Sequence, residues 1–583
     1  MSNTLHDNAS LSLGGSRWPQ DQAGIALQAA VLVVATFTAY FPAIFAGYIW
    51  DDAKVLYANP LIQAPDGLKR IWFTTEAEDY WPLCYTMFWF EWRIWGSNPM
   101  PYHIGNIALH ALAAVLLWRV LRRLNLGDAG AFLGAMIFAV HPVTVASVAW
   151  ITERKNVLSM AFYLASILAY LRHEDQVSRR WYAVSLIAAA AALLAKTSAV
   201  VLPVVLLLLS WWRPGRVTPG RVLRVLPFFV LSLAMGLATV WFQHHNAIMN
   251  DVVRPEGMAS RVAASGWIAW FYLYKDLVPI GLAMIYPRWD VDGGRLVSFL
   301  PLALLIGGFA VLWVCRGGWS RGPLAALGYF VIALGPMLGF VDMSYMKNSL
   351  VADHLQYVAM PGVIALAAGV LANLGVQRQG PAARPARLGR AALCAAVVLV
   401  LAVLTWKQAE TYKDEETLWN HAIRLYDRSW AAYNNRGAFY DSLGDSERAI
   451  DDLSEAIRLK PDYADAYNNR GIAYYHLEDW DRAMGDYGKA IELNPNDATT
   501  YNNRGALHNR NGHYDRAIRD YTKAIELDPG YASAYDNRAK ACFSLGQYDK
   551  AWADVWTCRQ LGGRPSPDLI QSLSRVTVTS RSE

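Results

Sequence analysis

Two adjacent carboxylates, Asp51 and Asp52, follow the first long apolar run of the chain in the segment GYIWDDAKVLYANP, residues 47–60. A carboxylate beside a hydroxyl can remove its proton as a general base, and carboxylates also bind divalent cations such as Mg²⁺ or Mn²⁺. Neighbouring side chains point about 100° apart in a helix and to opposite faces of a strand. We therefore expect one aspartate at most to face a substrate, while the other orients a neighbour or binds a cation.

Further polar side chains recur near the ends of the apolar runs. Charged groups there are unfavourable unless they pair or line a water-filled cavity, so they indicate function. For any single cation, the alternative is that it snorkels from a span end to lipid headgroups. Cations can hold a phosphate while negative charge builds on it, and the candidates for this role are Arg154, Lys155, Lys196, His244 and His354. The candidates for lining the same cavity are Arg93, His103, Asn106, His141, Glu153 and Asp353. With the aspartates, this set suits the transfer of a sugar from a lipid phosphate to a hydroxyl.

The composition is typical of an integral membrane protein. Of 583 residues, 54% are hydrophobic and 17% are charged, which is too apolar for an ordinary soluble protein. The five cysteines include no close-spaced pair that would indicate a disulfide framework or a zinc site. Arginines between the apolar runs account for the net charge of +5 through membrane topology, so nucleic-acid binding is not expected.

The apolar runs predict about eleven membrane spans. Basic connections between them mark the cytoplasmic side. The alternation holds only if 260–290, which contains Lys275 and Asp276, forms an interfacial or re-entrant hairpin on the outer side. The amino terminus is then cytoplasmic, whereas the polar residues above and the last third of the chain lie outside. The spans are expected near 24–46, 101–121, 129–149, 156–171, 181–195, 198–212, 224–243, 296–315, 323–341, 355–375 and 389–406.

Beyond residue 408 a strict period of 34 residues replaces the apolar runs, as at Tyr433, Tyr467 and Tyr501. This period is typical of the tetratricopeptide helix-turn-helix repeat. Small residues such as Gly471 and Ala483 would let the paired helices approach closely. Stacked pairs form a superhelix with a concave face. Units are expected to begin near 430, 464, 498 and 532, after a degenerate unit at 412–427.

One asparagine per repeat occupies the same register. A ladder of amides along a concave groove would hydrogen-bond the backbone of an extended protein or peptide acceptor. The alternative is that these amides bond between adjacent repeats. The four positions are Asn435, Asn469, Asn503 and Asn537.

The order of these motifs resembles the transmembrane and tetratricopeptide-repeat O-mannosyltransferases and their bacterial relatives. The resemblance implies the GT-C glycosyltransferase fold, an acidic motif in the first outer loop at Asp51 and Asp52, and a polyprenyl-phosphate sugar as donor. Two departures concern the donor side, namely Thr197 in place of a frequent acid and HLQY at 354–357 in place of an arginine-containing pattern. The motifs are GYIWDD, WPLCYTMFWFEWRIWGSNPMPYHIGNIALH (81–110), HPVTVASVAWITERKNVLS (141–159), LLAKTSAVVLPVVLLLL (193–209), YLYKDLVPIGLAMIYP (272–287) and DHLQYVAMPG (353–362).

We therefore expect an all-α protein with a GT-C-like membrane domain and a tetratricopeptide-repeat superhelix. The expected parts are a cytoplasmic tail at 1–23, the membrane domain at 24–408, the repeats at 412–565 and a flexible tail at 566–583.

The first hypothesis is a glycosyltransferase that moves mannose or a similar hexose from a polyprenyl-phosphate donor to a hydroxyl of an exported protein. One alternative is a membrane-anchored repeat scaffold without enzyme activity, and another is a carrier-lipid flippase or O-antigen-type ligase. No outer segment contains an Asn-x-Ser/Thr site, which favours a bacterial inner membrane with periplasmic repeats over an endoplasmic reticulum membrane with lumenal repeats.

Overall fold

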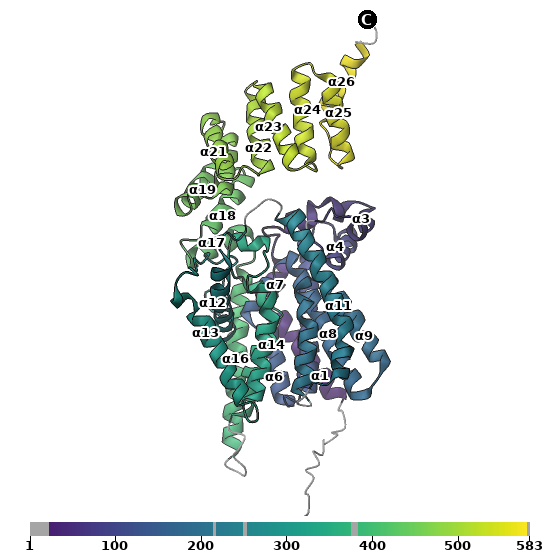
Figure 1. Cartoon of the computed structure of the whole chain (residues 1–583), viewed down its shortest axis with the longest axis vertical. Helices are drawn as coiled ribbons and strands as arrows, with labels where there is room; N and C mark the ends of the chain where they lie inside the picture. Colours follow the sequence, from purple (N-terminus) through teal and green to yellow (C-terminus); the bar gives the residue numbers. More distant parts are fainter. Residues whose placement is uncertain (1–21, 78, 214–216, 249–252, 375–382, 580–583) are drawn as a thin grey trace, which may run out of the picture.

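The structure is a computed structural model that describes residues 22–77, 79–213, 217–248, 253–374 and 383–579. Within these ranges the regular structure is helical and includes no strand, as the all-α prediction requires. Figure 1 shows an elongated molecule, with a bundle of helices below and the repeats above. The expected cytoplasmic tail at 1–23 lies almost wholly outside the described residues.

Every apolar run that the sequence singled out contains a helix of the bundle. Within the described ranges, five helices are long and apolar enough to cross a membrane, or six if α6 and α7, bent by 46°, form one span. The helices are α1 (Gln22–Ala39), α2 (Pro60–Gln63), α3 (Gly67–Phe73), α4 (Pro82–Trp95), α5 (Pro99–Arg123), α6 (Asp128–Ala139), α7 (Val145–Val148), α8 (Arg154–Gln176), α9 (Arg179–Ala195), α10 (Leu202–Trp212), α11 (Pro219–Phe242), α12 (Met258–Leu277), α13 (Leu300–Val314), α14 (Arg321–Leu334), α15 (Met360–Asn373) and α16 (Ala383–Glu410).

The segment 260–290 forms a hairpin, in which helix α12 is followed by a stretch of irregular chain that runs back along it. After α12 the chain turns back, so that the rings of Tyr286 and Trp289 pack against Phe271 at centroid distances of 4.9 and 5.3 Å. The amide of Gly293 then donates to the hydroxyl of Ser260 at the start of α12 (3.0 Å). This arrangement agrees with the expected hairpin.

The repeats form four helix pairs, as the period predicts. A Cβ at Gly471 would lie 2.7 Å from the ring of Tyr487, so only glycine permits this helix approach. An arginine of the first helix in each pair forms two bonds with an aspartate of the second, as Arg470 does with Asp486 (2.8 and 2.9 Å). The helices are α17 (Glu415–Leu425), α18 (Trp430–Ser442), α19 (Ser446–Leu459), α20 (Ala464–His476), α21 (Trp480–Leu493), α22 (Ala498–Arg510), α23 (Tyr514–Leu527), α24 (Ala532–Ser544) and α25 (Tyr548–Gln560).

The prediction of a flexible tail at 566–583 is wrong for most of that segment, because helix α26 (Pro567–Thr579) follows the last pair. Leu569 and Leu573, one helical turn apart, are buried against a cluster that includes Val555 of α25. A terminal repeat has no following neighbour to cover its apolar face, and α26 supplies that cover. Residues 580–583 lie outside the described ranges.

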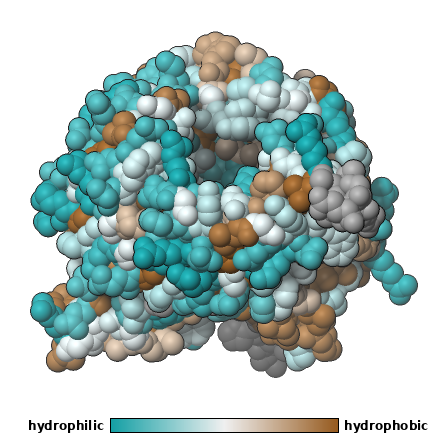
Figure 2. Space-filling model, turned by 90° about the horizontal axis from the view of Figure 1, so that it is seen from above, coloured by the Kyte–Doolittle hydropathy of each residue, from teal (hydrophilic) through white to brown (hydrophobic). Residues whose placement is uncertain are grey.

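Helix α17 joins the repeats to the upper end of the bundle. The hydroxyl of Tyr426 donates to the carbonyl of Gly281 (2.9 Å), and His421 Nε2 lies 3.0 Å from the carbonyl of Leu282. Lys347 of the bundle pairs with Asp465 of α20 (3.1 Å). Figure 2 looks down on the molecule from the side of the repeats; the surface seen there is mostly hydrophilic and is hollowed near its centre.

Candidate active site

The two aspartates face different surroundings. Asp52 is fully buried, and its Oδ1 accepts hydrogen bonds from the amide (2.8 Å) and hydroxyl (2.6 Å) of Thr152, while Oδ2 accepts one from the amide of Ile49 (3.0 Å). Burial and the neighbouring Asp51 raise the pKa of Asp52 to about 7, against the lowering effect of these bonds. Asp52 therefore anchors the loop, whereas Asp51 is only partly buried.

The chain after the aspartates forms a π-helical turn, η2 (Ala53–Tyr57). Its Val55 and Leu56 are buried in a second apolar cluster with residues of α2, α3 and α4. Short π-helical stretches are frequent at functional sites, because the wider turn changes where side chains point. The turn holds the acidic motif at the upper end of the bundle.

A buried carboxylate between two lysines lies beside the acidic motif. Glu153 ends a short turn, η4 (Ile151–Glu153), and its oxygens pair with Lys155 Nζ (2.9 Å) and Lys196 Nζ (3.3 Å). Burial raises the pKa of Glu153, but the two lysines outweigh this effect and hold it well below its usual range. Two ammonium groups thus share the carboxylate of Glu153. The charge of Lys155 is within electrostatic range of Asp51.

His354 belongs to the same cluster but is not a cation at neutral pH. Burial lowers the pKa of its imidazole to about 4. Its ring meets those of Trp150 and Tyr345 edge-on, at centroid distances of 5.5 and 5.2 Å. Among the described residues, no hydrogen-bond partner reaches His354 Nδ1, Trp150 Nε1 or the hydroxyl of Tyr48, although all three atoms are buried. Buried polar atoms normally have partners, so a polar ligand would complete this set.

The structure adds residues that the sequence analysis missed. Gln243 Nε2 donates to Asp79 Oδ2 (2.7 Å), and Asp79 attracts the charges of Lys155 and Lys196. The ring of Trp81 lies 4.0 Å from Lys155 Nζ. Trp81 stood in a motif already singled out, whereas nothing in the sequence distinguished Asp79 from other loop carboxylates.

His244 does not join this cluster. It is exposed on a π-helical turn, η6 (Gln243–Ala247), while the adjacent Gln243 points to Asp79. Consecutive residues of a helical turn diverge by about 100°. The structure therefore brings Gln243, and not the predicted His244, into contact with Asp79.

Arg154 is not placed to bind a phosphate. Its guanidinium is fully buried, where Nε donates to Asn106 Oδ1 (2.6 Å), Nη2 donates to the carbonyl of Tyr102 (2.6 Å) and Nη1 pairs with Glu91. The group holds α8 against α4 and α5. Because Arg154 and Lys155 are consecutive in α8, only Lys155 turns toward the cluster.

Four of the residues that were predicted to line the cavity contact backbone carbonyls. Arg93 donates to Ala64 (2.6 Å), Asn106 donates to Trp150 (3.1 Å), and ring nitrogens of His103 and His141 lie 3.4 and 3.1 Å from the carbonyls of Gly47 and Asp276. Arg93 also stacks over Trp89, 3.3 Å from the ring centroid. Asn106, His103 and His141 thus hold backbone near the upper end of the bundle, whereas Arg93 is exposed and binds backbone between α2 and α4.

Asp353 lies in a separate buried acidic pair. The hydroxyl of Tyr286 donates to its Oδ1 (2.8 Å), and Asp276 lies close enough for the two charges to repel. Burial raises the pKa of Asp353 to about 7. The adjacent residues Asp353 and His354 thus face different clusters.

The asparagines of the repeats bond between neighbouring repeats. Asn469 Nδ2 donates to Asn434 Oδ1 (3.1 Å), and Asn503 and Asn537 donate in the same way to the preceding repeat, both at 3.0 Å. Asn435 accepts from Asn434 (3.3 Å) at the start of the ladder. In the structure these amides therefore make the contacts between adjacent repeats that the sequence analysis gave as the alternative to binding a peptide.

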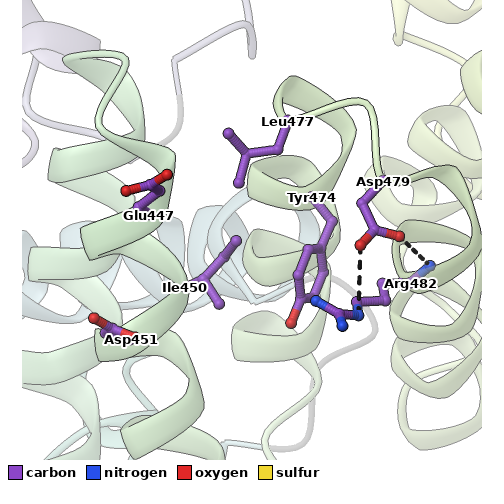
Figure 3. A pocket seen from close by; sticks show the side chains of 7 residues that line it. All are labelled: Glu447, Ile450, Asp451, Tyr474, Leu477, Asp479 and Arg482. Atoms are coloured by element: carbon purple, nitrogen blue, oxygen red, sulfur yellow. Dashed lines mark hydrogen bonds and ion pairs between the residues drawn. The ribbon is translucent and has the colours of Figure 1, made fainter.

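The repeats also carry a pocket of about 500 Å³ between α19, α20 and α21 (Figure 3). Its wall includes an ion pair of Arg482 with Asp479 (3.4 Å). Three carboxylates among its residues would favour a basic segment of a partner over an acidic one. The lining residues are Glu447, Ile450, Asp451, Tyr474, Leu477, Asp479 and Arg482.

A divalent cation at the acidic motif would need ligands besides the carboxylates of Asp51 and Asp52. Mg²⁺ and Mn²⁺ prefer several carboxylate or carbonyl oxygens, but both oxygens of Asp52 already accept hydrogen bonds. Within the described residues, no three acidic, histidine or cysteine side chains group in a way that could hold a metal. Lys155 and Lys196 already place positive charge beside the motif.

Known proteins resemble both parts of the chain. Residues 81–242 match the family described as dolichyl-phosphate-mannose-protein mannosyltransferase, and tetratricopeptide-repeat families match 437–478, 464–497, 498–531 and 520–553. Human protein O-mannosyl-transferase TMTC3 is 23% identical over 492 residues, which cover 76% of this chain and 52% of that protein. Human TMTC1 is 31% identical over 179 residues, or 28% of this chain and 20% of that protein. The chain thus spans about half of these relatives, or less.

Among solved structures, the crystal structure of MamA matches with 24% identity and a TM-score of 0.23, over 25% of this chain and 85% of that one. The chain is thus a helical protein with apolar helices suited to a membrane, in which a body similar over 81–242 to the mannosyltransferase family precedes a tetratricopeptide-repeat superhelix. The family matches confirm the resemblance to the transmembrane and tetratricopeptide-repeat O-mannosyltransferases.

Proposed function

We propose that the protein transfers mannose, or a similar hexose, from a polyprenyl-phosphate donor to a hydroxyl of a protein acceptor. The observation that carries this proposal is the pair of lysines on Glu153, at 2.9 and 3.3 Å, beside the acidic motif. Sugar transfer from a lipid phosphate needs a base at the acceptor and positive charge at the leaving phosphate. The mannosyltransferase match over 81–242, which includes both lysines, agrees with this chemistry.

In the proposed reaction, the acceptor oxygen forms a bond to the anomeric carbon while the bond from that carbon to the phosphate oxygen breaks. The carboxylate of Asp51 takes the hydroxyl proton. The ammonium groups of Lys155 and Lys196 hold the released polyprenyl phosphate. His354 Nδ1 and Trp150 Nε1, which lack partners among the described residues, would donate hydrogen bonds to oxygens of the sugar-phosphate donor. No step requires a divalent cation, because the lysines supply the positive charge.

The repeats would hold the acceptor near this site and raise its local concentration. They stand at the same end of the molecule as the acidic loop (Figure 1), and α17 packs directly on the body. We propose that this end faces the periplasm of a bacterium, or the lumen of the endoplasmic reticulum in a eukaryote. The amino terminus would then face the cytoplasm.

The direct test uses the purified full chain in lipid nanodiscs with polyprenyl-phosphate mannose and a Ser/Thr-containing peptide. Mass spectrometry should find one hexose on the peptide, and GDP-mannose should not replace the lipid donor. The Asp51→Asn variant is the control. Movement of the carrier lipid across the bilayer without any peptide product would instead favour the flippase alternative.

A further inference from the structure

The backbone at Trp50, directly before the acidic pair, has a conformation that large side chains rarely adopt. Its φ is +48°, in the left-handed region. Bulky residues are genuine outliers there, and such strain persists only where the surroundings impose it. Something in the structure must therefore hold Trp50 in place.

The ring of Trp50 lies between two buried tryptophans from different parts of the molecule. It stacks on Trp150, with centroids 5.2 Å apart and planes 9° apart, and it meets the edge of Trp419 at 5.5 Å. Trp150 belongs to the membrane body, whereas Trp419 belongs to α17. Their exposed fractions are 3% and 1%, so this stack is part of the core.

Two further contacts connect residues 47–50 to the segment that contains Trp419. The amide of Gly47 donates to the carbonyl of Lys413 (2.8 Å), and the backbone of Trp50 lies near the carboxyl group of Glu415, where it offsets part of the rise in pKa that burial causes. Residues 413–419 thus contact residues 47–50 at three points. This segment belongs to the degenerate first unit of the repeats.

The other side of the acidic pair is fixed by the body. Asp52 accepts two hydrogen bonds from Thr152, whose position precedes Glu153 and Lys155. Asp51 therefore lies between Trp50, which contacts α17, and Asp52, which binds Thr152 of η4, directly before α8. A shift of either neighbour would change the position of the Asp51 carboxylate relative to Lys155.

We propose that Trp419 is a positioning residue, which acts through Trp50 to hold the Asp51 carboxylate in its reactive place. The first helix of the repeat domain is then part of the active-site framework as well as a link to the acceptor-binding repeats. This inference rests on the proposed function, because it assigns a role in that reaction.

The test compares Trp419→Ala and Trp419→Phe in transfer to a short peptide at saturating donor. Misplacement of a reacting group by about 1 Å reduces rates about 100-fold, so kcat should fall by about that factor in Trp419→Ala while the KM for the peptide stays unchanged. Trp419→Phe should recover part of the rate. Trp118→Ala is the matched control, because Trp118 is fully buried in α5 but lies 15 residues along that helix from His103; it should lower stability without changing kcat.

A double-mutant cycle isolates the path through Trp50. In a Trp50→Gly background, which removes the ring and tolerates the positive φ, Trp419→Ala should cause no further loss of kcat. Additive losses, or a rise in peptide KM with unchanged kcat, would overturn the positioning role. If Trp419→Ala does not fold, Glu415→Ala against Glu415→Gln tests the same contact, because glutamine retains an acceptor oxygen.

A second measurement does not depend on activity. Amide hydrogen exchange of residues 47–57 should be faster in Trp419→Ala than in the wild type, and unchanged in Trp118→Ala. If the wild type transfers no sugar but exchange rises as expected, the proposed function fails and the support of the loop by α17 stands. Unchanged exchange in Trp419→Ala overturns the inference, whatever the transfer assay finds.

Discussion

Asp52 and Thr152, 100 residues apart in the chain, share two hydrogen bonds that join the acidic loop to η4, the turn directly before α8. This contact fixes which of the two aspartates is structural. It also sets the distance between the acidic motif and the lysine cluster that follows Thr152. The two aspartates should therefore fail in different ways when they are replaced.

Asp51→Asn should abolish most transfer while the protein remains stable. Loss of a general base reduces rates about 10²- to 10⁴-fold, and asparagine keeps the size of the side chain. Asp52→Ala should instead destabilise the protein by about 2–4 kcal/mol, since it leaves the buried donors of Thr152 and Ile49 unsatisfied. Steady-state kinetics and thermal unfolding in detergent measure both effects. Equal stability losses in the two variants would contradict the separation of roles.

Thermal stability should fall as the pH rises from about 4 to about 7. Burial raises the pKa of Asp52 from 3.8 to about 7, so the folded state binds a proton that the unfolded state has released in this window. Stability from this group is complete below the unfolded pKa and is lost as the pH rises through the folded value. Glu415 acts in the same direction, because burial raises its pKa from 4.5 to about 7.

The matched control for this pH dependence is Asp52→Asn, which cannot titrate. Unfolding temperatures recorded across the window should decline less steeply in the variant than in the wild type. An identical slope in both proteins would mean that Asp52 is not the group responsible. The opposite effect of Glu153, whose pKa is lowered by Lys155 and Lys196, is confined to more acidic pH.

Replacement by methionine should have different effects at the consecutive residues Arg154 and Lys155. Arg154→Met leaves Glu91 buried without its partner, which destabilises by about 3–5 kcal/mol, so the protein should be lost from the membrane. Lys155→Met should retain the fold but lower kcat about 100-fold, as expected for the loss of one group that stabilises the leaving phosphate. Expression levels and kinetics separate the outcomes. Replacing Glu91 with leucine in the Arg154→Met protein should restore much of the expression.

The sequence predicted local features better than long-range contacts. The period of 34 residues located every repeat, since Gly471 and Tyr487 meet within one helix pair. The clustering of polar residues at one end of the bundle followed from charge and hydropathy. The bond of Asp52 to Thr152 joins chain segments that lie far apart in the sequence. Whether Gln243 or His244 faces Asp79 depends on the rotation of the helical turn. The spacing of residues in the sequence determines neither.

Transfer should not depend on a divalent cation. Both oxygens of Asp52 already accept hydrogen bonds, and the ammonium groups of Lys155 and Lys196 provide the charge that a metal would supply. Rates measured after treatment with EDTA should match those in Mg²⁺ or Mn²⁺. Loss of activity in EDTA that is restored by Mn²⁺ would contradict this expectation and point to a cation held by Asp51.

Alanine at Asn469, Asn503 or Asn537 should loosen the repeats rather than weaken acceptor binding. Each amide donates to an asparagine of the preceding repeat at 3.0–3.1 Å, and the net loss per bond is about 1 kcal/mol. Hydrogen exchange in α18 to α24 of the full chain should therefore accelerate, while KM for a long peptide acceptor stays within about twofold, well below the effect of losing 1 kcal/mol of binding. If KM rises in all three variants while exchange is unchanged, the amides bind the acceptor backbone directly. A variant at the exposed Trp556, which has an exposed fraction of 63%, controls for nonspecific effects on the repeats.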